Sequence, residues 1–330
     1  MRVAISADVA QVAEHVLGKD EVTSSNLVIS SKDISSDKGK ICLFSCPNLW
    51  YIERKIVYII SVRRNGMKIT ALVENETKCE LKSKHGLSLY IETQNHKILF
   101  DLGPDNTLFE NAKVRGINLS AIDTVIISHG HMDHGGALKQ FFQINSTAKI
   151  YVQRKAFESH YSKFLFLKVN VGLNKEFENH PQVILIDGDY QIDDELSLLT
   201  VKDTSKCYSN ANNALYTKTS KDDFSHEQHL IIREHQVALI MGCGHTGIVN
   251  IMKKAEQYHP TLCIGGYHLF NPLTKKTVSS ELLNQIAKEL GRYSETKFYT
   301  CHCTGTVAFD FLSQRLSNLF YLSCGETVIV

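Results

Sequence analysis

The sequence predicts a mixed α/β fold in which two β-sheets pack together and helices cover their outer faces. From Met67 onward, short apolar runs typical of strands alternate with helical segments. Strands dominate each half of this stretch and helices lie between them, as expected of two packed sheets with helices outside. A chain of 330 residues, 43% of them hydrophobic, is long enough to bury such a core.

Each element can be placed by its periodicity. Apolar and alternating runs predict strands at 68–73, 87–92, 97–101, 124–128, 149–152, 183–186, 198–201, 229–233, 237–241, 261–264, 297–299 and 327–330. Helical spacing predicts helices at 107–114, 135–142, 247–258, 279–290 and 306–316. Residues 157–178 are too long for a simple connection and are predicted to form a lid or a pocket wall.

Residues 1–66 lack this periodicity, and their middle is a polar stretch, SSNLVISSKDISSDKGK. Codons for residues 7–30 can be chosen so that they spell a tRNA cloverleaf with a threonine-type anticodon. Codons for residues 63–66 can spell a ribosome-binding site just before the Met67 codon. We therefore expect residues 1–66 to be a non-native or disordered extension and Met67 to be the true start.

Composition and charge narrow the class of protein. A net charge of +1 gives no reason to expect a nucleic-acid partner. The apolar segment Ile56–Val62 is too short to cross a bilayer, and the first twenty residues lack a signal-peptide pattern. Nine cysteines, an odd number, favour reduced thiols. We expect a soluble cytoplasmic protein that acts on a small molecule and uses neither nucleic acid nor a membrane; the oligomeric state stays open.

Three imidazoles and one carboxylate fall within six residues, directly after a predicted buried strand. The segment is His129-Gly130-His131-Met132-Asp133-His134, and a helix is predicted to follow it. Such crowding suits neither a core nor a solvated face, whereas divalent zinc prefers nitrogen and carboxylate ligands. His129 and His131 can bind one ion, and Asp133 and His134 can bind a second, neighbouring ion. We expect zinc, one or two ions per chain, with Mn²⁺ or Fe²⁺ as alternatives.

The HxHxDH pattern resembles the second motif of the metallo-β-lactamase superfamily, and the resemblance runs from about Met67 to the C-terminus. It implies a four-layer αβ/βα sandwich over residues 67–330, with the metals at one edge between the sheets. The family's first motif, an Asp that ends an early strand, matches Asp101 in ILFDLG. The resemblance implies that this residue does not bind the metal itself but orients the ligands through hydrogen bonds.

Later segments resemble a subgroup labelled dihydropteroate-synthase-like, or named after a ribofuranosyl-aminobenzene-phosphate synthase. They are MGCGHTGIVN at 241–250, GGYHL at 265–269 and CHCTG at 301–305. The resemblance implies that His245 completes the site of the first ion and His302 that of the second.

Two site residues keep open roles. The family's usual bridging Asp is not evident, and Cys243 stands where it is expected. Cys243 is therefore either a ligand or a structural thiol, and without a bridge a single ion is an alternative. His268 is a ligand, a catalytic acid that faces the substrate, or a purely structural residue.

Other histidines and cysteines give weaker signals. His226 and His229 are expected to be exposed at a strand start. His160 and Tyr161 are expected to lie on a surface helix, with contact to the substrate from the predicted lid as the alternative. Alternation at a strand end predicts that the thiols of residues 301 and 303 point away from the histidine between them.

The resulting functional expectation is a metal-dependent hydrolase of the metallo-β-lactamase type. A metal-bound hydroxide would attack an ester, thioester, lactone or phosphoester, with Asp133 both binding metal and orienting the nucleophile. Alternatives are a phosphoribosyl-type transferase, suggested by the subgroup label, and a metal-containing ligand-binding module. Intact ligands at every main position argue against the module.

A chain that begins at Met67 should express, bind metal and unfold at the same temperature as the 330-residue chain. The reason is that residues 1–66 offer no face to bury. Metal analysis and thermal unfolding of both lengths check this, and unfolding of the shorter chain would show that the leader belongs to the fold.

Overall fold

The computed structural model describes residues 22–24, 27–29, 34–37, 40–43, 66–164 and 167–330. The chain divides into two compact units, residues 1–65 and residues 66–330. In the first unit two antiparallel hairpins are described: β1 (Val22–Ser24) with β2 (Leu27–Ile29), and β3 (Ile34–Asp37) with β4 (Lys40–Leu43). The apolar segment at residues 56–62 lies outside the described residues.

The second unit contains two seven-stranded sheets. The first has the order β12-β9-β8-β7-β6-β5-β23, made of β5 (Lys68–Val73), β6 (Ser88–Glu92), β7 (Lys97–Phe100), β8 (Thr124–Ile126), β9 (Lys149–Gln153), β12 (Val183–Ile186) and β23 (Thr327–Ile329). The second has the order β13-β14-β16-β17-β18-β21-β22, made of β13 (Tyr190–Gln191), β14 (Leu196–Leu199), β16 (His229–Arg233), β17 (Val237–Ile240), β18 (Leu262–Gly265), β21 (Lys297–Thr300) and β22 (Leu319–Tyr321).

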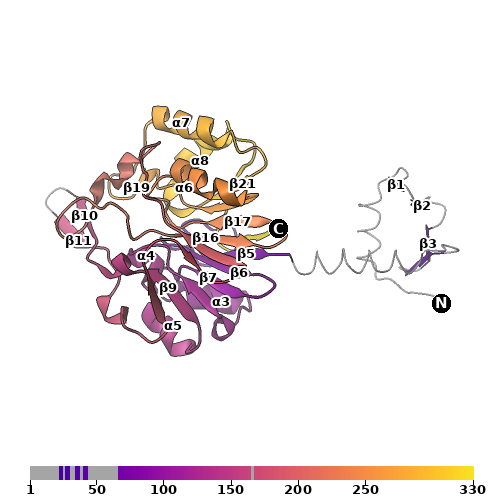
Figure 1. Cartoon of the computed structure of the whole chain (residues 1–330), viewed down its shortest axis with the longest axis horizontal. Coiled ribbons are helices and arrows are strands. Elements are labelled where there is room, and N and C mark those ends of the chain that lie inside the picture. Colours follow the sequence, from indigo (N-terminus) through magenta and orange to yellow (C-terminus); the bar gives the residue numbers. More distant parts are fainter. Residues whose placement is uncertain (1–21, 25–26, 30–33, 38–39, 44–65, 165–166) are drawn as a thin grey trace. The chain divides into compact units, whose positions relative to one another are not determined.

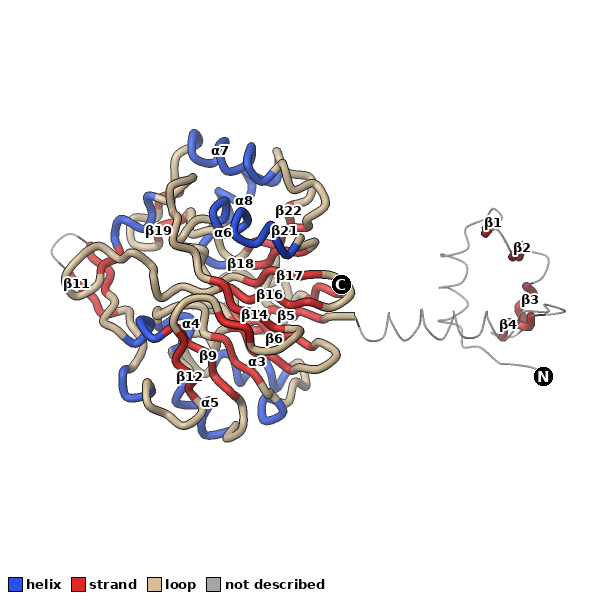
Figure 2. The backbone as a smooth tube through the Cα atoms, in the orientation of Figure 1, coloured by secondary structure: helices blue, strands red, loops and turns tan. Residues whose placement is uncertain are grey.

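Helices cover the outer face of each sheet. They are α3 (Thr107–Val114), α4 (Met132–Gly135), α5 (Leu138–Ile144), α6 (Ile248–Ala255), α7 (Ser280–Leu290) and α8 (Thr306–Ser313). In Figure 1, α6, α7 and α8 lie on one side of the paired sheets while α3 and α5 lie on the other, and Figure 2 shows the strands between them. The predicted four-layer αβ/βα sandwich is therefore confirmed.

Three apolar clusters follow the layers. The central cluster joins inward-facing side chains of both sheets, such as Phe100 and Ile126 from the first and Leu230 and Ile240 from the second. Each of the two outer clusters packs one sheet against its own helices. The alternation of strand side chains sends neighbouring residues to different layers, which explains why these strands are apolar on both faces.

Helix α7 shows how local sequence sets an element. Ser279 caps it, with its side chain accepting a hydrogen bond from the Leu282 backbone N–H at 3.4 Å. Leu283, Ile286 and Leu290 then recur at helical spacing and are buried.

The single helix predicted at residues 135–142 is instead two, α4 and α5. A Cβ on Gly136 would lie 2.4 Å from the Pro104 carbonyl oxygen, so the backbones touch at this point. The break places α4 at the end of the histidine segment, where it carries Asp133 and His134.

Residues 157–178 hold a hairpin of β10 (Tyr161–Phe164) and β11 (Leu167–Asn170), with β15 (Leu215–Tyr216) pairing with β10. Just after the hairpin, the Val171 carbonyl accepts a hydrogen bond from the Met132 N–H at 2.7 Å. The segment is thus tied to the histidine loop, as a pocket wall would be.

Among the residues that the structure describes, no helix is both long and apolar enough to cross a membrane. Within residues 66–330 the seven cysteines are all free.

Ile240→Ala should lower the free energy of unfolding by about 2–5 kcal/mol, because Ile240 is fully buried between the two sheets. Ile329→Ala, at a position 64% exposed on β23, should change it by less than about 0.5 kcal/mol. Urea unfolding of both variants measures the difference, and equal stabilities would contradict the central cluster.

Candidate metal centre

The predicted site residues lie where parallel strands of the two sheets end. In the first sheet β7 runs parallel to β8, and in the second β17, β18 and β21 run parallel to one another. The loops after these strands carry Asp101 (after β7), His129 to His134 (after β8), Cys243 and His245 (after β17), His268 (after β18) and His302 (after β21). Carboxyl ends of parallel strands are where open α/β sheets bind ligands.

A first group consists of His129, His131 and His245. His129 Nε2 lies 3.0 Å from His131 Nδ1. The His245 ring lies 4.9 Å from the His129 ring and 5.0 Å from the His131 ring, between centroids. All three side chains are buried.

A second group consists of Asp133, His134 and His302. The Nε2 atoms of His134 and His302 are 3.2 Å apart. Asp133 Oδ2 lies 3.4 Å from His302 Nε2 and 3.8 Å from His134 Nε2. The structure therefore brings together residues separated by more than 160 positions, as expected for a shared centre.

In four of the five histidines of these two groups, Nδ1 donates a hydrogen bond to a neighbouring oxygen atom. His134 donates to Asp101 Oδ2 at 2.6 Å, and His302 donates to Asn75 Oδ1 at 2.9 Å. The other two bonds run from His245 to Asn212 Oδ1 at 2.8 Å and from His129 to Ser128 Oγ at 2.8 Å. Oxygen acceptors at Nδ1 fix the tautomer and leave the Nε2 lone pair free for a cation.

The geometry fits divalent ions. With Nδ1 donating, the Nε2 lone pairs of His134 and His302 face each other, which is unfavourable unless a proton or a metal ion lies between them. Metal–nitrogen bonds of about 2.0–2.1 Å at the tetrahedral angle place two nitrogens about 3.3 Å apart, close to the separations found. His245 Nε2 is buried with no hydrogen-bond partner among the described residues, so it too is available to an ion.

The electrostatics differ between the two groups. Burial, followed by repulsion from neighbouring imidazoles, lowers the pKa of His129 and of His245 well below the usual value. Burial alone would also lower the pKa of His134, but the carboxylates of Asp101 and Asp133 raise it to about 9. The first group is thus neutral and ready to bind an ion, while His134 must first lose a proton.

Three site residues adopt a left-handed backbone that is rare outside glycine. The φ angles are 63° at Asp101, 46° at His268 and 51° at His302. Each such conformation costs about 1–3 kcal/mol and is typical of functional sites.

His268 lies beside the first group. Its ring centroid is 4.2 Å from that of His245, and its Nδ1 is buried without a hydrogen-bond partner among the described residues. Its backbone N–H donates to Cys303 Sγ at 3.3 Å.

Sequence reasoning missed several residues that support the site. Glu74 accepts the His302 backbone N–H at 2.6 Å, and Glu227 accepts the His245 backbone N–H at 2.7 Å. His85 Nε2 lies 3.4 Å from Asp133 Oδ2 on the half-exposed side of the second group. Burial, followed by the charge of His302, lowers the pKa of His85 to about 4. No local pattern marks these residues, because their partners lie far away in the sequence.

The expectations for His160 and His226 were wrong, because both are buried. Both donate to Asp222 Oδ2, at 2.8 Å and 3.2 Å respectively. His226 Nδ1 also accepts the Gly130 backbone N–H at 2.9 Å. Since an imidazole that accepts at Nδ1 carries its proton on Nε2, His226 positions the histidine loop rather than binding an ion there.

Two further expectations are corrected. His229 is fully buried within β16 rather than exposed, and burial lowers its pKa to about 3. Residues 302–304 form a short 3-10 helix instead of continuing a strand. This turn brings the Cys303 sulfur within 4.8 Å of both the Cys243 sulfur and a ring nitrogen of His268.

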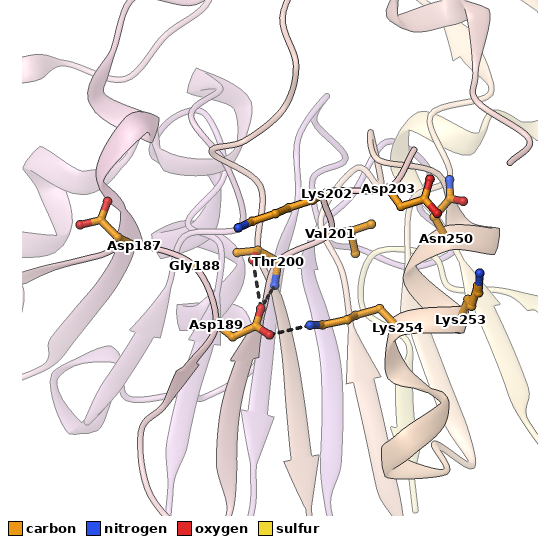
Figure 3. Close-up of a pocket in the computed structure, with 10 residues that line it drawn as sticks. All are labelled: Asp187, Gly188, Asp189, Thr200, Val201, Lys202, Asp203, Asn250, Lys253 and Lys254. Atoms are coloured by element: carbon orange, nitrogen blue, oxygen red, sulfur yellow. Dashed lines mark hydrogen bonds and ion pairs between the residues drawn. The ribbon is translucent and has the colours of Figure 1, made fainter. Parts of the chain in front are cut away.

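A surface cavity of about 620 Å³ lies elsewhere (Figure 3). Its walls carry lysines and aspartates, including an ion pair between Lys254 and Asp189 at 2.7 Å. None of the ten residues lining it belongs to the two histidine groups. Its mixed charges favour no particular ligand.

Comparison with known proteins agrees with the fold. Residues 84–204 match the family model described as Metallo-beta-lactamase superfamily. An uncharacterised protein of Methanocaldococcus jannaschii is 28% identical over 267 residues, which cover 79% of this chain and 99% of that protein. The 7,8-dihydropterin-6-methyl-4-(beta-D-ribofuranosyl)-aminobenzene-5'-phosphate synthase of the same organism is 27% identical, over 72% of this chain and 87% of its own.

Solved structures show the same architecture. A metal-dependent hydrolase of the beta-lactamase superfamily superimposes with a TM-score of 0.68 at 24% identity, over 80% of this chain and 99% of its own. An isothiocyanate hydrolase from Delia radicum gut bacteria gives 0.50 at 13% identity, over 80% of this chain and 99% of its own. These likenesses show that the chain has the fold of these proteins, and residues 84–204 match the model of the metallo-β-lactamase superfamily.

Asn212→Ala should weaken metal binding by about 10- to 100-fold, because the amide holds both Nδ1 and the carbonyl of His245. Its exposed neighbour offers a matched control, Asn213→Ala, which should leave the affinity unchanged. Titration against a chromophoric chelator measures both, and equal affinities would exclude the supporting role of Asn212.

Proposed function

We propose that this protein is a hydrolase that uses two divalent metal ions. His129, His131 and His245 bind one ion, and Asp133, His134 and His302 bind the other. The observation that carries this proposal is the inward orientation of the imidazole nitrogens. Four rings donate through Nδ1 to an oxygen behind them and turn Nε2 toward a common centre. Zinc suits this set of nitrogen and carboxylate donors, and Mn²⁺ or Fe²⁺ are alternatives.

When bound, a divalent ion lowers the pKa of its water to about 7 and polarises the oxygen of the bond to be cleaved. The protein's own groups supply position and proton transfer. The Asp133 side chain is 21% exposed, so its carboxylate would accept a hydrogen bond from the attacking water and orient it. The His268 ring lies 4.2 Å from the His245 ring, and its buried Nδ1, which has no hydrogen-bond partner among the described residues, would donate a proton to the leaving group.

The substrates that this chemistry serves are small esters, thioesters, lactones and phosphoesters. Two solved structures of this fold are named as hydrolases, one of them metal-dependent. We further propose that residues 67–330 are sufficient for it, since every group named above lies within them.

Metal-loaded protein should hydrolyse at least one member of a panel of esters, thioesters, lactones and phosphodiesters. His129→Ala combined with His131→Ala should abolish both the turnover and the stoichiometric metal found by elemental analysis, because the first ion loses two of its three ligands. The exposed His235→Ala is the control and should retain both. Full metal content in the double variant would refute the assignment.

A second candidate is a transferase, favoured by the synthase relative. It would form a bond between the amine of a ribofuranosyl-aminobenzene phosphate and the 6-methyl carbon of a dihydropterin that carries a leaving group there, and it would release that leaving group and a proton rather than hydrolyse the panel. Mass spectrometry of a mixture of both compounds with the protein distinguishes the two reactions. Metal binding without either reaction would indicate a ligand-binding module.

A further inference from the structure

Cys243 lies between the two histidine groups. Its side chain is 3% exposed, and its sulfur is 3.2 Å from His134 Nε2. The sulfur forms one cluster with nitrogens of His129 and His245 and another with nitrogens of His134 and His302. Within each cluster the ligand atoms all lie within 4.8 Å of one another. One sulfur is therefore within reach of both ion positions.

The glycines on either side explain this placement. A Cβ on Gly242 would lie 2.2 Å from Ser128 Oγ, so the backbone here is in direct contact with the histidine loop. Gly244 has a φ of 63°, and a Cβ there would lie 2.6 Å from the Gly266 carbonyl oxygen. A tight turn fixed by two glycines holds the Cys243 side chain between the groups.

A negatively charged ligand is needed between the two ion positions, where Cys243 lies. An imidazole binds a metal ion without adding negative charge, so among the six residues of the two groups only Asp133 is an anion. Two divalent cations so close together repel each other strongly unless an anionic ligand lies between them. A thiolate is such a ligand, and it binds zinc at about 2.3 Å.

We propose that the Cys243 thiolate bridges the two metal ions. The inference rests on the proposed function, because it requires both ion positions. As each centre fills, the S–H bond breaks, its proton passes to solvent, and two sulfur–metal bonds form without any change in oxidation state. The sulfur then belongs to both coordination spheres and couples the binding of the second ion to that of the first.

Cobalt(II) provides a direct readout, because a cobalt–thiolate bond absorbs in the near ultraviolet through sulfur-to-metal charge transfer. The wild-type chain should bind two Co²⁺ and show this band. Cys243→Ala should lose the band and bind the second ion at least tenfold more weakly. Cys243→Asp should restore two ions without the band, since a carboxylate also bridges. Cys263→Ala, a fully buried cysteine in β18, is the matched control and should behave as wild type.

The outcomes separate the two proposals. Two tightly bound ions with an undiminished band in Cys243→Ala would overturn the bridge while leaving the metal centre intact. A band lost only in Cys303→Ala would overturn it equally, because the neighbouring sulfur would then be the ligand. A wild-type chain that binds no cobalt would overturn the proposed function and the bridge together. Circular dichroism of each variant confirms that it is folded.

Discussion

The arrangement of the site depends on one buried carboxylate, that of Asp101. It accepts the Ser128 backbone N–H at 2.7 Å, the Ser128 hydroxyl at 2.7 Å and His134 Nδ1 at 2.6 Å. These bonds tie the end of β7 to the loop after β8 and orient His134. Because the Ser128 hydroxyl donates its hydrogen bond to Asp101, it can only accept a hydrogen bond from His129 Nδ1. A single side chain thus orients one histidine of each group.

An unpaired carboxylate would be costly at a fully buried position, and Asp101 is stable there because all its contacts are donors. Glu227 is a second buried carboxyl group whose contacts include several hydrogen-bond donors. Burial raises the pKa of Glu227, but its oxygens accept the backbone N–H groups of His245 and Thr246 and the Thr246 hydroxyl. Three of the loops that carry the site residues are therefore anchored by a buried acid: Asp101 for the loop after β8, Glu227 for the loop after β17 and Glu74 for the loop after β21. This preorganisation keeps the imidazoles in place before an ion arrives.

Asp222 helps to position the histidine loop, because it accepts hydrogen bonds from His160 and His226, and His226 in turn contacts Gly130. Burial raises the pKa of Asp222, but the bonds from His160 and His226 outweigh burial and lower it. Gly130 is required here, since a Cβ would lie 2.5 Å from the Ala156 carbonyl oxygen and 2.7 Å from His160 Nε2. The glycine between the two histidines of the motif thus allows the close packing that aims both rings inward.

The site's main ligand types were readable from the chain because they are local. Three imidazoles and a carboxylate within residues 129–134 predict a shared cation, and apolar periodicity alone predicted two packed sheets. The strand at residues 183–186 and the helix near residues 280–290 were placed almost to the residue, since their patterns are strong. The break between α4 and α5 was missed, because it arises from contact with Pro104.

Only the tertiary structure decided how the distant groups combine. It brought His245 and His302 to the histidine loop, and it buried His160, His226 and His229, which the sequence suggested were exposed. Polar residues such as Asn75 and Asn212 carry no signal of their own in the chain. Their role exists only because the carboxyl ends of parallel strands from two sheets meet at one edge, where a side chain's function is set by neighbours more than 30 residues away. The sequence thus determined which residues are candidate metal ligands, and the packing of the sheets determined which of these candidates lie close together.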